Sequence, residues 1–222
     1  MATCDPDQLL EDGCGFDGLS NRDLEIAKAQ LICEIYNEIA NPTPGPILWE
    51  DLRTSAFSTK LGGSKDPDWV KFKDDGSGSR GVYTFAFDKA LVEEVYFAVQ
   101  LPHGWNEGTN LMFHVHWAPS GTDTSGDVVW CLEYTWASIN AVYSDTVVVG
   151  IADAPSGVAG THQMTSAIVI PASGKTASSM IMCRLFRDAA SAEGFGTDGY
   201  DEDAFMLEAD FHYQVIAIGQ EI

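Results

Sequence analysis

Residues 111–118 read LMFHVHWA, and residues 204–218 read AFMLEADFHYQVIAI. In both segments apolar and polar side chains alternate, which is typical of a β-strand with one buried face and one polar face. In the first segment His114 and His116 lie on the side opposite to Phe113, Val115 and Trp117. The two segments therefore predict a sheet that packs one face against an apolar core.

The same pattern extends over the C-terminal two thirds of the chain. Turn-forming Gly, Ser, Pro and Asp residues separate the segments, and no helical pattern lies between them. About eight strands of this kind predict a mainly β fold, an antiparallel β-sandwich or jelly roll over residues 81–222. The remaining predicted strands are 82–88, 94–101, 128–137, 145–151, 163–170 and 179–187.

The apolar positions of three strands supply the predicted core. Strict alternation in residues 204–218 also places Phe205 and Leu207 on the apolar side, and Glu208 on the polar side. In residues 128–137 the polar side carries Cys131, Glu133 and Thr135. The predicted core side chains are Phe113, Val115, Trp117, Trp130, Leu132, Tyr134, Trp136, Phe211 and Tyr213.

Residues 1–42 show a helical period instead, and Asn41-Pro42 ends it. Such a short helical module cannot enclose a core of its own, so its apolar stripe is predicted to attach to a partner. The side chains of that stripe are Leu24, Leu31, Ile35 and Ile39.

Residues 43–80 are rich in Pro, Gly, Ser and charged side chains, with isolated aromatic residues. This composition predicts an extended arm between the helical module and the β domain. Trp49, Trp69 and Trp105, in the arm or in loops, could stack on a sugar or be buried against the protein or another subunit.

The charge balance limits the classes of partner. Twelve Lys and Arg side chains face 33 Asp and Glu side chains, a formal net charge of −21. A surface of this sign repels phosphate backbones, so we expect no nucleic-acid binding. No apolar run reaches the ~18 residues of a membrane span, and no signal-peptide pattern is present, so we expect a soluble protein with no membrane partner.

His114 and His116 also raise the question of a metal site. Side chains two residues apart on a strand lie roughly 6.5–7 Å apart on one face, so a third ligand would come from a neighbouring strand. Their spacing from Gly108 partly resembles the first cupin motif, but Ser120 and Gly121 occupy the position of the expected Glu. We therefore predict a polar sheet face, with no cofactor and no favoured metal. The candidates for further ligands are Glu133, Glu208, Asp210 and His212.

No motif in the chain indicates catalysis. Residues 76–81 match the letters GxGxxG, but a strand follows them where a dinucleotide site requires a helix. Residues 173–176 resemble the end of a phosphate-binding loop, but lie between two strands. The five cysteines form no CxxC pair. The acidic residues of loop 198–203, with Asp188, predict a solvated loop or a divalent cation site.

Two stretches resemble proteins of tailed bacteriophages. Residues 2–35 resemble an N-terminal module of virion proteins, although Ile32 interrupts its Leu-Cys pair. The segments VYFAVQLPHGW, FHVHW, VVWCLEYTW and DEDAFMLEADFHYQV are similar to a second group of phage-encoded proteins. The residues that match the first module are Cys4, Asp5-Pro6, Leu9-Leu10, Cys14, Leu19-Ser20 and Leu31 with Cys33.

The resemblance implies a non-enzymatic structural component of the virion, on the head surface as capsid decoration, on the neck or on a fibre. Residues 1–42 would attach it to other virion proteins, and the β domain would form a homo-oligomer, for example a trimer. Assembly would take place in the bacterial host cytoplasm. Two alternatives stay open: a jelly-roll module that binds a host-surface glycan, and a cupin-like metal-dependent enzyme that uses His114 and His116.

Overall fold

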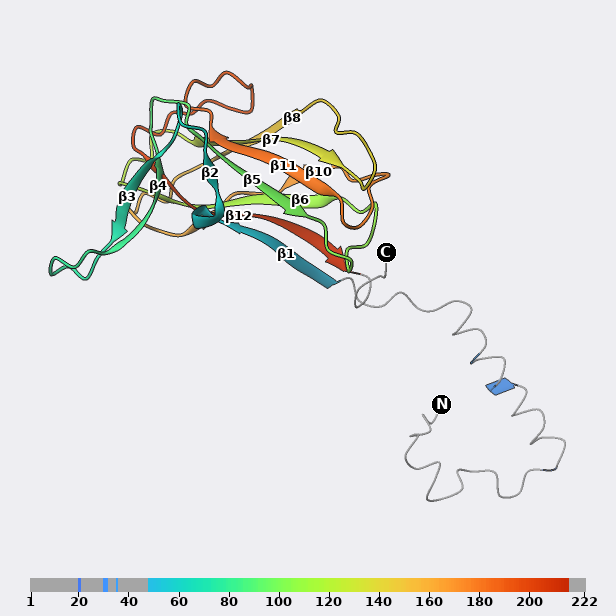
Figure 1. Ribbon diagram of the computed structural model, residues 1–222. Helices are drawn as coiled ribbons and strands as arrows, with labels where there is room; N and C mark the ends of the chain where they lie inside the picture. Colours follow the sequence, from blue (N-terminus) through green and yellow to red (C-terminus); the bar gives the residue numbers. More distant parts are fainter. Residues whose placement is uncertain (1–19, 21–29, 32–34, 36–47, 216–222) are drawn as a thin grey trace. The chain divides into compact units, whose positions relative to one another are not determined.

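The computed structural model describes residues 20, 30, 31, 35 and 48–215 (Figure 1). The chain divides into two units, Met1–Pro46 and Ile47–Ile222, and the fold below is that of the second unit. Apart from the short 3-10 helix η1 (Ala56–Ser58), the regular structure of its described residues, 48–215, consists of strands. In the described part of the chain, no helix is long and apolar enough to cross a membrane.

The first sheet is built around its longest strand, β12, and is called the β12 sheet. One edge of β12 pairs with β6, and the other edge pairs with β4 and then β1, all antiparallel. β3 lies beyond β4, whereas β9 and β10 pair with β6. Its strands are β1 (Leu48–Ser55), β3 (Asp68–Lys73), β4 (Val82–Phe87), β6 (Leu111–Pro119), β9 (Gln163–Met164), β10 (Ile168–Ile170) and β12 (Ala204–Val215).

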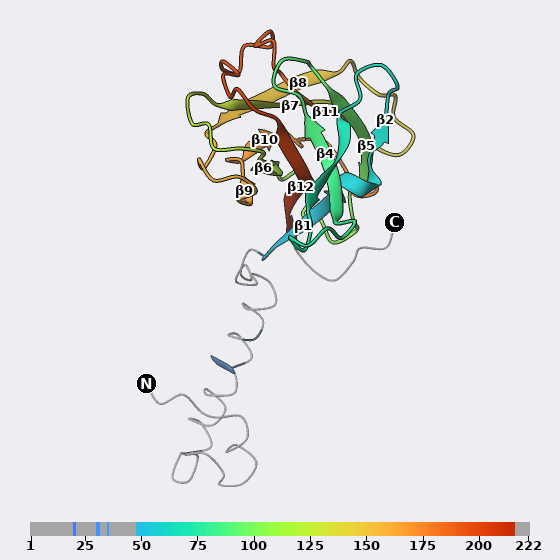
Figure 2. The ribbon, with the colours of Figure 1, turned by 90° about the vertical axis from the view of Figure 1, so that its left-hand side faces the viewer.

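The second sheet, called the β11 sheet, has the strand order β2-β5-β11-β7-β8 and is also antiparallel. Figures 1 and 2 show the two sheets as two layers, with β7, β8 and β11 in one and β6 and β12 in the other. The predicted mainly β sandwich of jelly-roll type is confirmed. The strands of this sheet are β2 (Lys60–Leu61), β5 (Glu94–Gln100), β7 (Val128–Ala137), β8 (Val147–Asp153) and β11 (Met180–Arg187).

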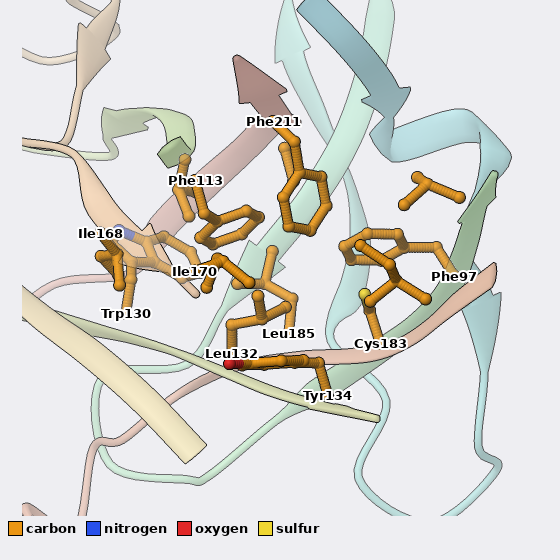
Figure 3. Close-up of a cluster of buried hydrophobic side chains, with 14 of the residues drawn as sticks. Phe97, Phe113, Trp130, Leu132, Tyr134, Ile168, Ile170, Cys183, Leu185 and Phe211 are labelled. Carbon is orange, nitrogen blue, oxygen red and sulfur yellow. The ribbon is translucent and has the colours of Figure 1, made fainter. Parts of the chain in front are cut away.

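The core lies between the sheets and is filled by the inward positions of both. In Figure 3, Phe113 and Phe211 project from the β12 sheet toward Leu132 and Leu185 of the β11 sheet. The rings of Phe113 and Phe211 lie 4.9 Å apart. All nine predicted core side chains are buried, none more than 8% exposed. Burial of each such side chain contributes about 1.5–3 kcal/mol, so the apolar faces drive the two sheets together.

A β-bulge in β12 changes the alternation that the sequence predicts. The register between β12 and β6 shifts between Met206 and Glu208. Met206 is therefore buried before the bulge, and Ala209 after it. Phe205 and Leu207, predicted to face the core, are only partly buried, and the Phe205 ring packs against Phe72 at 5.3 Å. The prediction for these two residues was wrong because a bulge adds one residue to the strand.

The predicted boundary at residue 81 is also corrected. β1 pairs with β12 over its whole length, from Leu48 opposite Val215 to Ser55 opposite Glu208. β2 and β3 pair with β5 and β4, so most of the predicted arm belongs to the sandwich. Most β1 side chains are exposed, and its backbone hydrogen bonds hold it in the sheet, so its sequence lacks the alternation of a core strand.

Part of the predicted helical module is described. Gln30, Leu31 and Ile35 have helical conformation. Leu24 and Ile39, the other members of the predicted apolar stripe, lie outside the described residues.

Candidate functional site

The outer face of the β11 sheet carries a groove of about 700 Å³. Because alternate residues of β5, β7 and β11 point into the core, the residues between them point outward and form most of the groove, with the buried Phe97 and Cys183 beneath them. β2 and the residues that precede β2 and β8 complete it. The lining residues are Ser58, Lys60, Glu94, Tyr96, Phe97, Ala98, Glu133, Thr135, Thr146, Met182, Cys183 and Arg184.

Arg184 lies between two carboxylates in this groove. Its Nη1 donates to Oε2 of Glu94 and its Nε to Oε2 of Glu133, each at 2.8 Å. Its guanidinium also lies 4.0 Å from the centre of the Phe186 ring. Burial alone would lower the pKa of Arg184, but the bonds to Glu133 and Glu94 outweigh it and raise that pKa. Arg184 is thus a fixed cation, with Nη2 unbonded among the described residues.

Glu133 is held in one orientation by a second donor. The hydroxyl of Thr146 donates to its Oε1 at 2.7 Å, so both carboxylate oxygens of Glu133 are bonded. The Thr146 bond, together with Arg184, lowers the pKa of Glu133. A carboxylate held ionised in this way accepts hydrogen bonds and is a poor general acid at neutral pH.

Tyr96 forms the aromatic part of the groove. Its hydroxyl donates to Oε1 of Glu94 at 2.8 Å, and this bond raises the pKa of Tyr96. The residue is 36% exposed, so part of its ring faces the groove. Lys60 lies directly opposite Tyr96 in the register of β2 and β5. An exposed ring beside fixed polar groups is suited to binding a ligand that has both apolar and hydroxyl surfaces.

The predicted metal ligands do not all come together. His114, His116, Asp210 and His212 lie on the outer face of the β12 sheet, where the His114 and His212 rings are 4.5 Å apart. Glu133 lies in the other sheet and bonds to Arg184 and Thr146, because β7 pairs with β11 and β8. The strand pairing that separates Glu133 from the histidines is not readable from the alternation of a single strand.

The carboxylates of the acidic loop bond to the protein itself. Asp198 pairs with Arg187, and Asp201 pairs with Nζ of Lys89 at 2.6 Å. The backbone N–H groups of Asp123 and Lys89 donate to Glu202 and Asp203. Both oxygens of Asp188 accept backbone N–H bonds within the loop. Loop 198–203 is therefore an ordered surface loop whose acidic groups are already bonded.

The three loop tryptophans differ in exposure. Trp105 is fully buried against Trp136, with ring centres 5.9 Å apart. Trp49 and Trp69 are 46% and 47% exposed. The Trp69 ring lies nearly parallel to that of Tyr83, which gives the outer side of β3 and β4 a small aromatic patch.

Sequence reasoning did not identify the groove. The sequence places Glu133 on the polar face of its strand. Glu94, Tyr96 and Arg184 are outward residues of β5 and β11, and the pattern of either strand alone does not mark them as site residues. The pairing of β11 with both β5 and β7 brings these side chains together. From sequence, the groove could have been sought only among the outward polar residues of all predicted strands.

No family model and no curated protein matches this chain. Solved structures similar to it include a family 35 carbohydrate-binding module from Clostridium thermocellum, with 10% identity over 72% of this chain and 97% of that chain, TM-score 0.40. A family 35 module of Abf62 from Cellvibrio japonicus is similar at 11% identity, over 77% and 95% of the chains, TM-score 0.39. Infectious bursal disease virus, Gx strain, has a similar region at 11% identity, over 77% and 34%, TM-score 0.35.

Proposed function

We propose that the β domain is a non-catalytic binding module that holds a neutral glycan in the groove on the β11 sheet. The observation that carries this proposal is Arg184, fixed between Glu94 and Glu133 on the groove floor, with the exposed ring of Tyr96 beside it. A sugar has polar edges of hydroxyl groups and an apolar face of C–H groups. Fixed charged groups bond to the edges, and an aromatic ring packs against the face.

The charge of the groove favours an uncharged ligand. Its charged lining residues are Lys60 and Arg184, against Glu94 and Glu133, so positive and negative side chains are equal in number. The chain as a whole has a formal charge of −21, which repels anionic ligands at long range. A neutral polyhydroxylated ligand is not repelled by this charge. Its hydroxyl groups donate hydrogen bonds to the carboxylates of the groove, and its oxygens accept hydrogen bonds from Arg184.

The groups in the groove are also fixed before a ligand arrives. Glu94 bonds to both Tyr96 and Arg184, and Glu133 to both Arg184 and Thr146. Because these side chains lose little further freedom on binding, the entropic cost of holding a ligand is small.

Titration calorimetry of the full chain with a panel of neutral oligosaccharides tests the proposal. We expect one saturable binder at least, with affinity lowered roughly tenfold or more by Tyr96→Ala and by Arg184→Lys, about 1.4 kcal/mol per tenfold. Arg184→Lys keeps the charge but cannot bond to both carboxylates with the same geometry. Tyr83→Ala, another partly exposed tyrosine but in the β12 sheet, is the matched control and should bind normally.

Either of two results would count against the groove. Binding that disappears in Trp69→Ala but survives in both groove variants would move the site to the aromatic patch of β3 and β4. The absence of binding across the panel would remove the glycan-binding function altogether.

A second candidate is the virion component implied by the phage resemblance, with other virion proteins and further copies of the chain as partners. Leu31 and Ile35 favour it, because these helical residues four positions apart are 57% and 48% exposed. Two apolar side chains one helical turn apart lie on the same side of a helix, where a partner would cover them. Mass spectrometry of purified particles that fails to find the chain would exclude this candidate. Both functions are compatible if the glycan belongs to the host surface.

A further inference from the structure

Four of the five histidines in the chain lie together on the outer face of the β12 sheet. The rings of His116 and His162 stack with centres 5.0 Å apart, and those of His114 and His212 lie 4.5 Å apart. Asp210 of β12 is paired in register with His114, so its side chain lies among these rings. This group is called the histidine cluster: His114, His116, His162, Asp210 and His212.

Asp210 is the unusual member of the cluster. The residue is only 2% exposed, and its Oδ1 has no hydrogen-bond partner among the described residues. Its Oδ2 lies 3.1 Å from Nε2 of His212 and 3.5 Å from Nε2 of His116. A buried carboxylate with an unbonded oxygen is costly unless a cation or a further donor reaches it.

The nearest arginine does not neutralise Asp210. Arg53 is opposite Asp210 in the register of β1 and β12, but its guanidinium donates to both oxygens of Glu208, at 2.6 and 2.9 Å. Asp51, on the same strand as Arg53 and opposite His212, brings a second carboxylate, whose Oδ1 lies 3.2 Å from Nε2 of His212. Three carboxylates, those of Asp51, Glu208 and Asp210, therefore lie beside a single arginine.

The donor atoms have the separations of ligands that share one ion. The possible ligand atoms of Asp51, Asp210 and His212 all lie within 4.8 Å of one another, and so do those of His116, Glu208 and Asp210. Ligands at the usual 2.0–2.1 Å from a tetrahedral Zn²⁺ are about 3.4 Å apart, close to the 3.1 Å and 3.2 Å from Nε2 of His212 to the oxygens of Asp210 and Asp51. The first set is the better one, because Arg53 already occupies Glu208.

Hydrogen bonds also fix the rings of His114 and His116. Nδ1 of His114 lies 2.9 Å from the carbonyl oxygen of Thr165. Because a carbonyl only accepts, Nδ1 of His114 is the donor of this hydrogen bond. Nδ1 of His116 lies within hydrogen-bond distance of Nε2 of His162, at 2.7 Å. This bond holds the His116 ring with its Nε2 3.5 Å from Oδ2 of Asp210. These hydrogen bonds hold the His114 and His116 rings in place beside Asp51, Asp210 and His212.

We propose that Asp210, His212 and Asp51 bind a divalent transition-metal ion, with Zn²⁺ as the ion this donor set suits. An imidazole ligand favours Zn²⁺ over the oxygen-binding ions Ca²⁺ and Mg²⁺. The ion takes the place of the hydrogen bonds between Nε2 of His212 and the two carboxylates, and the imidazole binds it through the Nε2 lone pair. The site lies on the opposite sheet from the groove and does not depend on glycan binding.

Equilibrium dialysis of the chelator-treated full chain against Zn²⁺, followed by elemental analysis, tests the proposal. We expect one Zn²⁺ per chain at this site, and at least tenfold weaker binding in Asp210→Asn and in His212→Gln. Asp210→Asn keeps the shape of the side chain, and His212 is partly exposed, so at least one variant should fold. His103→Gln is the matched control, because His103 bonds to Ser178 outside the cluster, and should retain full binding.

Thiolates are also zinc ligands in proteins, and Co²⁺ distinguishes a cysteine site from the histidine cluster. Cobalt bound by histidine and carboxylate gives weak visible bands without the strong near-ultraviolet band of a cobalt–thiolate bond. We expect the first spectrum, and its loss in His212→Gln. A thiolate spectrum, equal Zn²⁺ binding by wild type and Asp210→Asn, or a folded chain that binds no Zn²⁺ would each overturn the proposal.

Discussion

The guanidinium of Arg187 donates to both carboxylate oxygens of Asp198, from Nε at 2.9 Å and from Nη2 at 2.7 Å. Both side chains are at most 1% exposed. The remaining Arg187 donors bond to the backbone carbonyls of Phe87, Tyr200 and Glu202. One buried cation therefore connects the end of β11 to the end of β4 and to the loop that leads into β12.

We expect Asp198→Asn to lower the free energy of unfolding by about 3–5 kcal/mol, because it leaves the Arg187 charge buried without its partner. Urea unfolding followed by tryptophan fluorescence measures this loss. Lys89→Met, which breaks the exposed pair with Asp201, is the control and should change stability far less. Equal effects of the two substitutions would mean that the Arg187–Asp198 pair does not hold this end of the sandwich together.

Glu93 should make stability depend on pH. Burial raises the pKa of Glu93 from 4.5 to about 7, although one oxygen accepts a hydrogen bond from the backbone N–H of Asp88. The unfolded chain ionises Glu93 near pH 4.5, and the folded chain only near pH 7. This group therefore costs no stability below pH 4.5, and its cost grows as the pH rises to about 7.

Glu93→Gln keeps the hydrogen-bond acceptor and removes the charge. We expect it to raise the free energy of unfolding by about 1–3 kcal/mol at pH 8 and to leave it unchanged at pH 4. Urea titrations at a series of pH values measure the difference. Glu107→Gln, another carboxylate that accepts a backbone N–H bond, controls for the loss of one negative charge. A gain that is the same at pH 4 and pH 8 would rule out the explanation by ionisation.

Cys131 and Cys183 should be chemically inert in the folded chain. Burial raises the pKa of Cys131 to about 12, and burial also raises that of Cys183. Because the thiolate is the reactive form, an alkylating agent at pH 8 should leave both unmodified and should label both once denaturant is added. Peptide mass spectrometry after digestion reads each site separately. Native labelling at the rate of a free thiol would show that this region of the core opens readily.

The core strands could be predicted from sequence because the residues of each strand alternate between apolar and polar side chains. Phe113, Val115 and Trp117 alternate with polar residues, and such a strand must bury one face wherever it lies in the sheet. The edge strand β1 lacks this alternation. β1 is held mainly by backbone hydrogen bonds to β12, and because most of its side chains are exposed, its sequence predicts an arm and not a strand.

The candidate sites depend on pairing, which is a relation between distant segments. His114 and Asp210 become neighbours only because β6 and β12 pair, and Asp51 joins them only because β1 pairs with the other edge of β12. The bulge after Met206 then decides which residues of β12 face the core. Single-strand patterns identify the polar face, but not which polar residues share it.

The β domain should fold without residues 1–46. Its core extends from Ala56 to Val215, and every strand pair of the described chain lies within residues 48–215. We expect a chain of residues 47–222 to keep the β-type circular dichroism spectrum and to melt within a few degrees of the full chain.

The same truncated chain also tests the assembly role predicted for residues 1–42. Light scattering of both chains gives their oligomeric masses. If the helical module serves only attachment, the two chains share one oligomeric state and the shorter one no longer binds its particle. A truncated chain that folds but becomes monomeric would instead show that residues 1–46 hold the oligomer together, because apolar side chains such as Leu31 and Ile35 then pack between copies.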